Sequence, residues 1–434
     1  MARRPAATAA RPGAPAALPA AAFEQAADLT AALAARLTEL EVGGGAWHLD
    51  EDLVRGHVLL PLVIAAANDL APPQPTPPAR PAPGGGWVCV DLGPDDEELF
   101  ERFAATVDAA IADGGPAPDA EAFAAAAQSW RLPVTPLRAP SGTAGVPGPG
   151  RPCGCDTPPL RPRPTARPGR PLAGVRVLDL TAMWAGPLAT WLLAAAGAEV
   201  IKIEAPCRID GLRRSTRPAT AGPGPGALFV ALDGGKSHRS LDLREPAALA
   251  ALLELVTDAD AVVDSFSPRV RPNLGIDAAT LRRRRPGLID VGVRAYPSGG
   301  AEAGWVAYGG GAHATGGLAI GPDGAPRRAA CAYPDPLAGL EAALAVVTAL
   351  GTADPGAPGA PGEVTLHGAA TATAARARRG GTGAQPIWVA AGELAGHVER
   401  AVARTVTSDG CRILPPPVAH RPADPTGAPE GVRP

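Results

Sequence analysis

The segment Gly174–Pro206 constrains the fold more than any other part of this sequence. It opens with a short apolar run, Val175–Leu180, and closes with a second one, Glu199–Glu204; such runs are typical of buried strands. The stretch between them, Pro187–Gly197, has a proline at its start and a glycine at its end, which predicts a helix. A strand–helix–strand unit of about thirty residues has the size of a βαβ crossover. It predicts parallel strands with a ligand at their carboxyl ends.

Short apolar runs keep alternating with helical patterns after this unit. Further strands are expected at Leu241–Leu243, Ala261–Phe266 and Leu288–Arg294, with helical stretches between them. Such alternation favours an α/β fold with a doubly wound parallel sheet, that is, a Rossmann-like large domain. The earlier residues 21–140 hold helical stretches around a strand candidate, Trp87–Leu92, which predicts a smaller α+β region.

The length of 434 residues allows two domains. Glycine (53 residues) and proline (52 residues) help to delimit them, because both cluster in the tails and linkers. The expected divisions are a disordered tail (1–20), a small region (21–140), a Pro/Gly linker (141–170), a large α/β domain (171–365) and a C-terminal region (366–434) that is largely disordered after 415.

Charge and cysteine content exclude several classes of function. The net charge is −3 and the arginines are scattered, so we expect no nucleic-acid partner. No apolar run reaches the roughly 18 residues of a membrane span, and no apolar core follows the first arginines as in a signal peptide, so we expect no membrane. Cys153 and Cys155 lack a second pair at zinc-binding spacing. We therefore expect free thiols, no metal and a cytoplasmic location.

Six motifs in a fixed order resemble those of the class III (CaiB/BaiF-type) CoA-transferases, over roughly residues 171–348. The motifs are VRVLDL…IKIEAP, GKSHRSLDL, ADAVVDSFSPRV with LGID, RPGLIDVGVRAY, AYGGGAHATGGL and PDPLAGLEAALAVV. The resemblance implies that the protein moves CoA between an acyl-CoA and a carboxylic acid. It also implies an interlocked homodimer.

The first region resembles the same family in another way. Its stretches WVCVDLGPDDEELFERF and AFAAAAQSWRLPVTPL look like late segments of a class III transferase, where a small domain returns toward the large one. A tail-like region thus precedes a head-like region. The chain is either a tandem fusion cut short at both ends or a rearranged member that builds the same fold in another order.

Recognition of CoA requires cations for its phosphates and an apolar slot for adenine. The resemblance implies that eight positions contribute to this site: Met183, Trp184, Ala185, Lys236, Arg239, Phe266, Tyr308 and Gly309. Lys236 matches a family lysine associated with the CoA phosphates. The alternative is a structural role, with Trp184 and Phe266 in the core and Lys236 and Arg239 on a solvated strand edge.

The family's catalytic aspartate follows an aromatic residue, and here Gly309 follows Tyr308 at that position. Glycine has no nucleophile, so another group must act if the chain is a transferase. The candidate carboxylates are Asp335, Asp323 and Glu302, and Asp335 also suits a helix cap.

His313 is a candidate general acid or base, because an imidazole with a pKa near 6.5 suits movement of an α-proton. Three functions stay open at this point. They are a CoA-transferase, an acyl-CoA racemase or isomerase, and a CoA-ester-binding paralogue without catalysis.

Overall fold

A computed structural model describes residues 17–139, 160–352, 361–380 and 388–422, except residues 74, 78, 94, 95, 161 and 322. Its centre is a six-stranded sheet in the order β11-β10-β9-β6-β7-β8, with every neighbouring pair parallel. The strands are β6 (Arg176–Leu180), β7 (Glu199–Glu204), β8 (Lys236–Ser240), β9 (Ala261–Asp264), β10 (Ile289–Arg294) and β11 (Pro361–Thr365). The strand order reverses between β6 and β9, so the expected doubly wound α/β class is confirmed.

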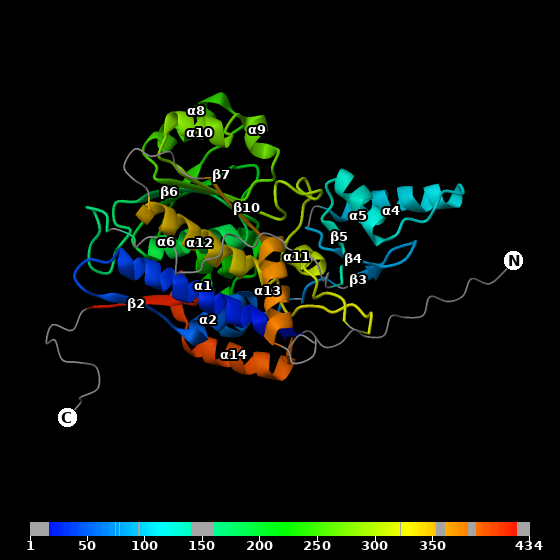
Figure 1. Cartoon of the computed structure of the whole chain (residues 1–434), viewed down its shortest axis with the longest axis horizontal. Helices are drawn as coiled ribbons and strands as arrows, with labels where there is room; N and C mark the ends of the chain where they lie inside the picture. The colour runs from blue at the N-terminus through cyan, green and yellow to red at the C-terminus, as the bar shows by residue number, and fades with distance from the viewer. Residues whose placement is uncertain are drawn as a thin grey trace.

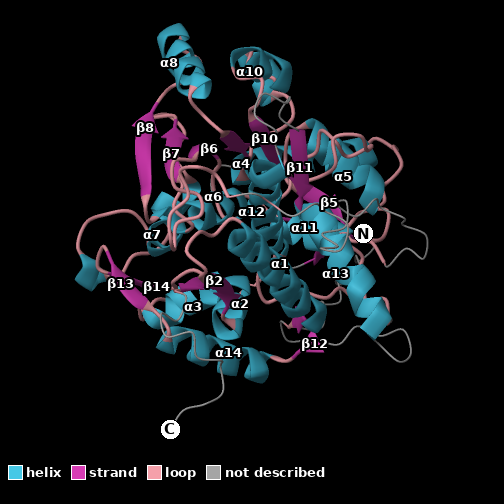
Figure 2. Cartoon of the chain, turned by 60° about the vertical axis from the view of Figure 1, so that its left-hand side comes forward, coloured by secondary structure: helices cyan, strands magenta, loops and turns pink. Residues whose placement is uncertain are grey.

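Helices cover both faces of this sheet (Figure 1). One face packs against the largest apolar core, to which α6, α12 and α1 contribute. The other face packs against α8 and α10. The helices are α1 (Ala20–Glu39), α6 (Ala185–Ala195), α8 (Pro246–Thr257), α9 (Val270–Leu274), α10 (Ala278–Arg284) and α12 (Pro334–Thr352). Figure 2 shows the strands of the large sheet side by side, with β8 at one edge and β11 toward the other.

The edge strand β8 differs from the prediction, which expected a strand at Leu241–Leu243. The strand instead spans Lys236–Ser240, and four of its five residues are exposed. An edge strand needs no apolar run, because it lacks a neighbour on one side and helices cover it only in part. Leu241 and Leu243 follow the strand and pack into the core beneath α8.

A small α+β unit, here residues 79–136, lies beside the carboxyl edge of the large sheet (Figure 1). Its antiparallel sheet has the order β3-β4-β5, and its aromatic core includes Phe103 and Phe123. The elements are β3 (Ala79–Pro81), β4 (Trp87–Val90), α4 (Glu97–Ala112), α5 (Ala120–Ser129) and β5 (Val134–Pro136). The Asp119 carboxylate begins α5 by accepting a hydrogen bond from the Ala122 amide at 2.9 Å.

The remaining elements lie outside the large sheet and the small α+β unit. They are β1 (Leu18–Pro19), β2 (Ala46–Leu49), α2 (Glu51–Val58), α3 (Leu60–Ala67), α7 (Ala227–Asp233), α11 (Gly309–Thr315), α13 (Leu366–Gly380), β12 (Trp388–Val389), α14 (Ala391–Ala403), β13 (Val406–Ser408), β14 (Cys411–Ile413), β15 (Val418–Arg421) and two 3₁₀ turns, Gly211–Arg214 and Ala219–Ala221. Strand β15 pairs with β2, so this part of the segment after 415 is ordered, contrary to expectation.

The core does not follow the expected division at residue 140. Residues 18–64 share one apolar cluster with the large sheet and α12, whereas the small α+β unit has a core of its own. Part of the expected linker is also held in place, since Leu160 is buried and Arg163 pairs with Asp260 at 3.1 Å. The parts of the expected tail, linker and disordered end that fall within 1–16, 140–159 and 423–434 lie outside the described residues.

Helix α12 has the length and mean hydropathy (1.2) of a membrane span, but 67% of that window is buried inside the structure. It packs against α1 and α6 as a core helix. The glycine at position 339 permits close approach, because an added Cβ there would lie 2.6 Å from the Ala185 carbonyl oxygen.

We expect the substitution Leu33→Ala in α1 to destabilise the whole large domain. Leu33 is 1% exposed in the shared core, and truncating a buried leucine costs about 2–5 kcal/mol. Val406→Ala is the control, because Val406 is 50% exposed and its truncation should change stability by less than about 0.5 kcal/mol. The measurement is urea unfolding followed by the fluorescence of the tryptophans. If Trp191 in α6 reported the same urea midpoint in Leu33→Ala as in the wild type, the result would contradict the shared core.

Candidate functional site

The carboxyl edge of the sheet is built on two buried ion pairs. Lys236 Nζ lies 3.0 Å from Asp179 Oδ2, and Lys202 Nζ lies 3.0 Å from Asp210 Oδ2. All four side chains are at most 1% exposed. Burial alone would raise the pKa of Asp179, but the two ammonium groups offset this and hold it well below its ordinary value. Asp179 is therefore a permanent anion inside the fold.

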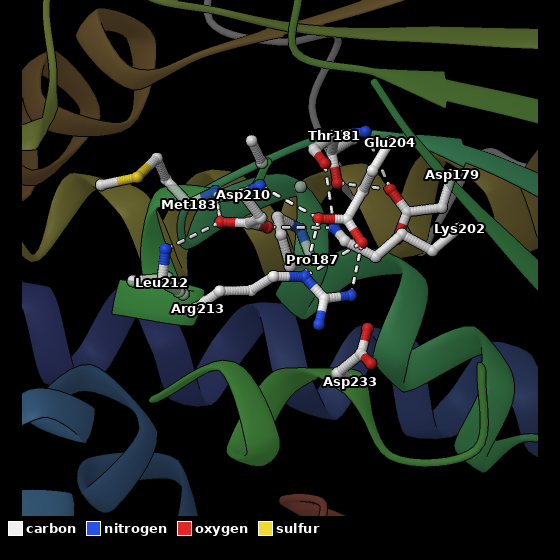
Figure 3. Close-up of polar contacts among 12 residues, drawn as sticks. Asp179, Thr181, Met183, Pro187, Lys202, Glu204, Asp210, Leu212, Arg213 and Asp233 are labelled. Carbon is white, nitrogen blue, oxygen red and sulfur yellow. Dashed lines mark hydrogen bonds and ion pairs between the residues drawn. The ribbon is translucent and has the colours of Figure 1, made fainter. Parts of the chain in front are cut away.

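These pairs fix the loop that follows β6 (Figure 3). Asp179 Oδ1 accepts hydrogen bonds from the Thr181 amide and hydroxyl at 2.9 and 2.5 Å, and Lys202 donates to the Thr181 carbonyl at 3.0 Å. Asp210 accepts from the Met183 amide at 3.0 Å. Met183 has φ +68°, a strained conformation for a residue with a side chain, and these bonds hold it there. The loop shape is thus imposed by buried charge.

Further charged side chains, on Arg213, Glu204 and Asp233, extend the network toward the surface. Arg213 donates to both oxygens of Glu204, and its guanidinium lies 3.8 Å from the centre of the Phe229 ring. His238 Nε2 lies 2.6 Å from Asp233. These contacts tie β8 and α7 to the end of β7.

The predicted CoA-contacting residues of this loop are only partly accessible. Met183 is 40% exposed, whereas Trp184 and Ala185 are buried in the core, and the indole Nε1 of Trp184 has no hydrogen-bond partner among the described residues. Trp184 therefore lies in the core, and its contact with CoA stays a prediction. Phe266 is half-buried and packs beneath α8, which is also a structural position.

Lys236 does not fit the expected contact with a CoA phosphate. Its ammonium is fully buried and already donates to Asp179 and to the Pro187 carbonyl, both at 3.0 Å. Arg239, three residues later on β8, is exposed and forms no ion pair within the described ranges. Of the two cations, Arg239 is the one whose charge faces solvent.

The Gly-rich stretch is held by the small α+β unit. The Gln128 side chain of α5 accepts a hydrogen bond from the Val306 amide at 2.7 Å and donates to the Val306 carbonyl at 2.8 Å. Arg131 donates to the Gly304 carbonyl at 3.0 Å, and the Arg138 amide donates to the Ala314 carbonyl at 3.0 Å. Tyr308 and Gly309, at the start of α11, are therefore positioned by a segment that comes much earlier in the sequence.

The Asp335 carboxylate occupies the space of the missing side chain at position 309. A Cβ added to Gly309 would collide with Asp335 Oδ2 and would lie 2.7 Å from the Ala332 Cβ. The Gly309 amide donates to the Asp335 carboxylate. Burial, together with the charge of Asp91, raises the pKa of Asp335 to about 7. The Asp335 carboxyl group, with its pKa raised to about 7, thus lies where a side chain at position 309 would stand.

Asp91 completes this group and was not foreseen. It follows β4 in the small α+β unit and accepts hydrogen bonds from the Gly310 and Gly311 amides. Burial raises the pKa of Asp91 to about 6. The available sequence signal was an acid directly after an apolar run, and the same signal marks Asp179 within β6.

The other predicted acid–base candidates are placed differently. His313 is buried, its Nε2 lies 3.1 Å from the Arg327 carbonyl, and burial lowers its pKa to about 4. It is a neutral, hydrogen-bonded core residue, which does not fit proton transfer. Glu302 pairs with Arg138 at 2.8 Å, and Asp323 has a 61% exposed side chain near Arg327. Of the acids proposed from sequence, Asp335 alone contacts the Gly309 position.

We expect Lys236→Met to destabilise the fold by about 3–5 kcal/mol, because it leaves the buried Asp179 carboxylate without its partner. Arg239→Met is the matched control on the same strand, and its exposed side chain should change stability by less than about 0.5 kcal/mol. Guanidinium unfolding of the two variants measures the difference. Equal stability of Lys236→Met and wild type would show that the ion pair is not structural.

Comparisons with known proteins agree with this architecture. Residues 172–385 match the family described as CoA-transferase family III. A probable fatty acyl-CoA transferase of Mycobacterium tuberculosis is 39% identical over 137 residues, 32% of this chain and 34% of that protein. Succinyl-CoA–D-citramalate CoA-transferase of Chloroflexus aurantiacus is 36% identical over 187 residues, 42% of this chain and 46% of that protein.

A crystal structure of the Mycobacterium tuberculosis protein aligns with a TM-score of 0.44 at 32% identity, covering 48% of this chain and 59% of that one. The chain spans less than half the length of the two curated relatives just described. The resemblance noted in the six motifs is confirmed by the family match over residues 172–385. Residues 172–385, which hold the large α/β domain, therefore match the class III CoA-transferase family.

Proposed function

We propose that the protein transfers CoA between an acyl-CoA and a carboxylic acid, with the Asp335 carboxylate as its nucleophile. The observation that carries the proposal is the position of this carboxylate in the space of a side chain at Gly309. Asp335 is 9% exposed, and Tyr308 next to Gly309 is 37% exposed, so the group lies near the surface. The family match of residues 172–385 supports the substrate class.

The proposed chemistry starts when an Asp335 oxygen attacks the thioester carbonyl carbon and the carbon–sulfur bond breaks. The products are a mixed anhydride on Asp335 and a free CoA thiolate. The thiolate then attacks the Asp335 carbonyl, which releases the donor acid as a carboxylate and leaves an aspartyl-CoA thioester. The acceptor carboxylate repeats the two steps in reverse and leaves as its CoA ester. Charge and atoms balance without an added proton or oxidant.

The accompanying proposals concern accessory groups, assembly and location. The exposed Arg239 and Met183 are the favoured contacts for CoA on this side of the sheet. A homodimer is proposed from the family resemblance. A cytoplasmic location is supported by the free thiols of Cys89, Cys207, Cys331 and Cys411.

We expect Asp335→Asn to lower thioester exchange by on the order of a thousandfold or more, because an amide cannot form the anhydride. Asp323→Asn is the control, since the Asp323 side chain is exposed. Wild-type exchange should rise with pH through about 7, because the ionised form of Asp335 is the nucleophile and its pKa is raised to that value. The assay is mass spectrometry of acyl-CoA and acid panels, with hydroxylamine trapping of an adduct on Asp335.

Two results would contradict the proposed function. Exchange that is unchanged in Asp335→Asn would assign the nucleophile to another residue. CoA-ester binding by calorimetry, without exchange or adduct in any acyl-CoA and acid pair, would support a binding paralogue.

We expect Gly309→Asp, which reinstates the family residue, to give no gain of exchange. Its Cβ would collide with the Asp335 carboxylate and crowd Ala332, and such overpacking costs about 1–3 kcal/mol. Gly304→Asp is the matched control in the same loop, because an added Cβ there meets nothing within 4 Å. Thermal unfolding and the exchange assay compare the two variants. A stable Gly309→Asp protein with increased exchange would show that the two carboxylates do not share one space.

A further inference from the structure

Two carboxylates share the first turn of α11. The Gly309 amide donates to Asp335, and the Gly310 and Gly311 amides donate to Asp91. Glycine at 310 permits the second contact, because an added Cβ there would lie 2.5 Å from Asp91 Oδ2. Three successive amides of one turn therefore hold two acids that come from distant parts of the sequence.

No basic side chain forms an ion pair with Asp91 or Asp335 among the residues that the structure describes. This contrasts with Asp179 and Asp210, each of which has a lysine partner. Two like charges held close together without a cation raise each other's affinity for a proton. The negative charge of Asp91 accordingly raises the pKa of Asp335, in addition to the effect of burial.

Several buried titratable groups around the pair stay neutral near pH 7, and the charged neighbours are Asp96, Arg208 and Arg328. Cys331 and Tyr333 lie just before α12, and burial raises the pKa of both. Burial also raises the pKa of Cys89 in β4. The pKa of Tyr308 is raised by burial and by the charges of Asp96 and Asp91, with Arg208 opposing. The neutral His313 ring bonds to the Arg327 carbonyl. The positive charge of Arg328 lowers the pKa of Cys89, against the larger effect of burial.

We propose that Asp91 is a positioning residue that sets the protonation state of Asp335, so that the small α+β unit completes the nucleophile site within the same chain. The catalytic role that this inference gives to Asp91 rests on the proposed function. Asp91 does not itself attack the thioester. It fixes the α11 turn through Gly310 and Gly311, and its negative charge keeps Asp335 protonated over more of the neutral range. Ionised Asp335 is then more basic than an ordinary carboxylate, which suits a nucleophile.

The test is a pH titration of the full-length protein labelled with ¹³C at the aspartate carboxyl carbons. The Asp335 and Asp91 signals are assigned from the spectra of Asp335→Asn and Asp91→Asn. In Asp91→Asn, the Asp335 midpoint should fall by about one pH unit or more, because a like charge has been removed. Asp96→Asn is the control: Asp96 lies on the same loop but bonds to the Gly93 amide at 2.9 Å, and its removal should leave the Asp335 midpoint in place.

The wild-type protein provides a second measurement once the two carboxyl signals have been assigned. Both carboxyl signals should titrate in two steps, since each reports the ionisation of the other. Independent one-step curves, or an Asp335 midpoint that is the same in Asp91→Asn and wild type, would overturn the inference. Coupled titration in a protein without exchange would refute only the proposed function. Exchange with a pH midpoint that does not move in Asp91→Asn would refute only the role of Asp91.

Discussion

The buried ion pairs Asp179–Lys236 and Lys202–Asp210 are the interactions on which the carboxyl edge of the sheet depends. They connect β6, β7, β8 and the turn that follows β7, and they fix the strained conformation of Met183. Isolated charges at this depth would be strongly unfavourable, and the pairing offsets that cost only if every partner is present. The loop between β6 and α6 is therefore rigid for an electrostatic reason, and this rigidity determines which of its residues a ligand can reach.

The Gly309 position is a close contact between α11 and the start of α12. The side chain is missing at 309, and the first turn of α12 brings the Asp335 carboxylate into the vacated space. Glycine at 309 and at 310 is required by this arrangement, because any Cβ would meet one of the two carboxylates. The lack of an aspartate side chain at position 309 and the burial of Asp335 and Asp91 thus belong to the same close contact.

The small α+β unit supports the same turn from the other side. Gln128, Arg131 and the Arg138 backbone bind the Gly-rich stretch, and Asp91 reaches the α11 amides. A segment that resembles a late part of the family therefore lies where it contacts the head-like region, although it comes first in this chain. The contacts also explain why the cores of residues 18–64 and of the large sheet are continuous while this unit keeps a separate one.

The sequence by itself determined the parallel sheet, the βαβ unit and the family resemblance, because these follow from local periodicity and from ordered motifs. It did not reveal β8, whose polar residues lie on an edge, or the burial of Lys236, which a short motif cannot show. Only the tertiary structure decided that Asp335 contacts Gly309, that Asp91 lies beside it and that His313 is a neutral core residue. The reason is physical: burial and charge pairing depend on neighbours from other elements, which no local pattern specifies.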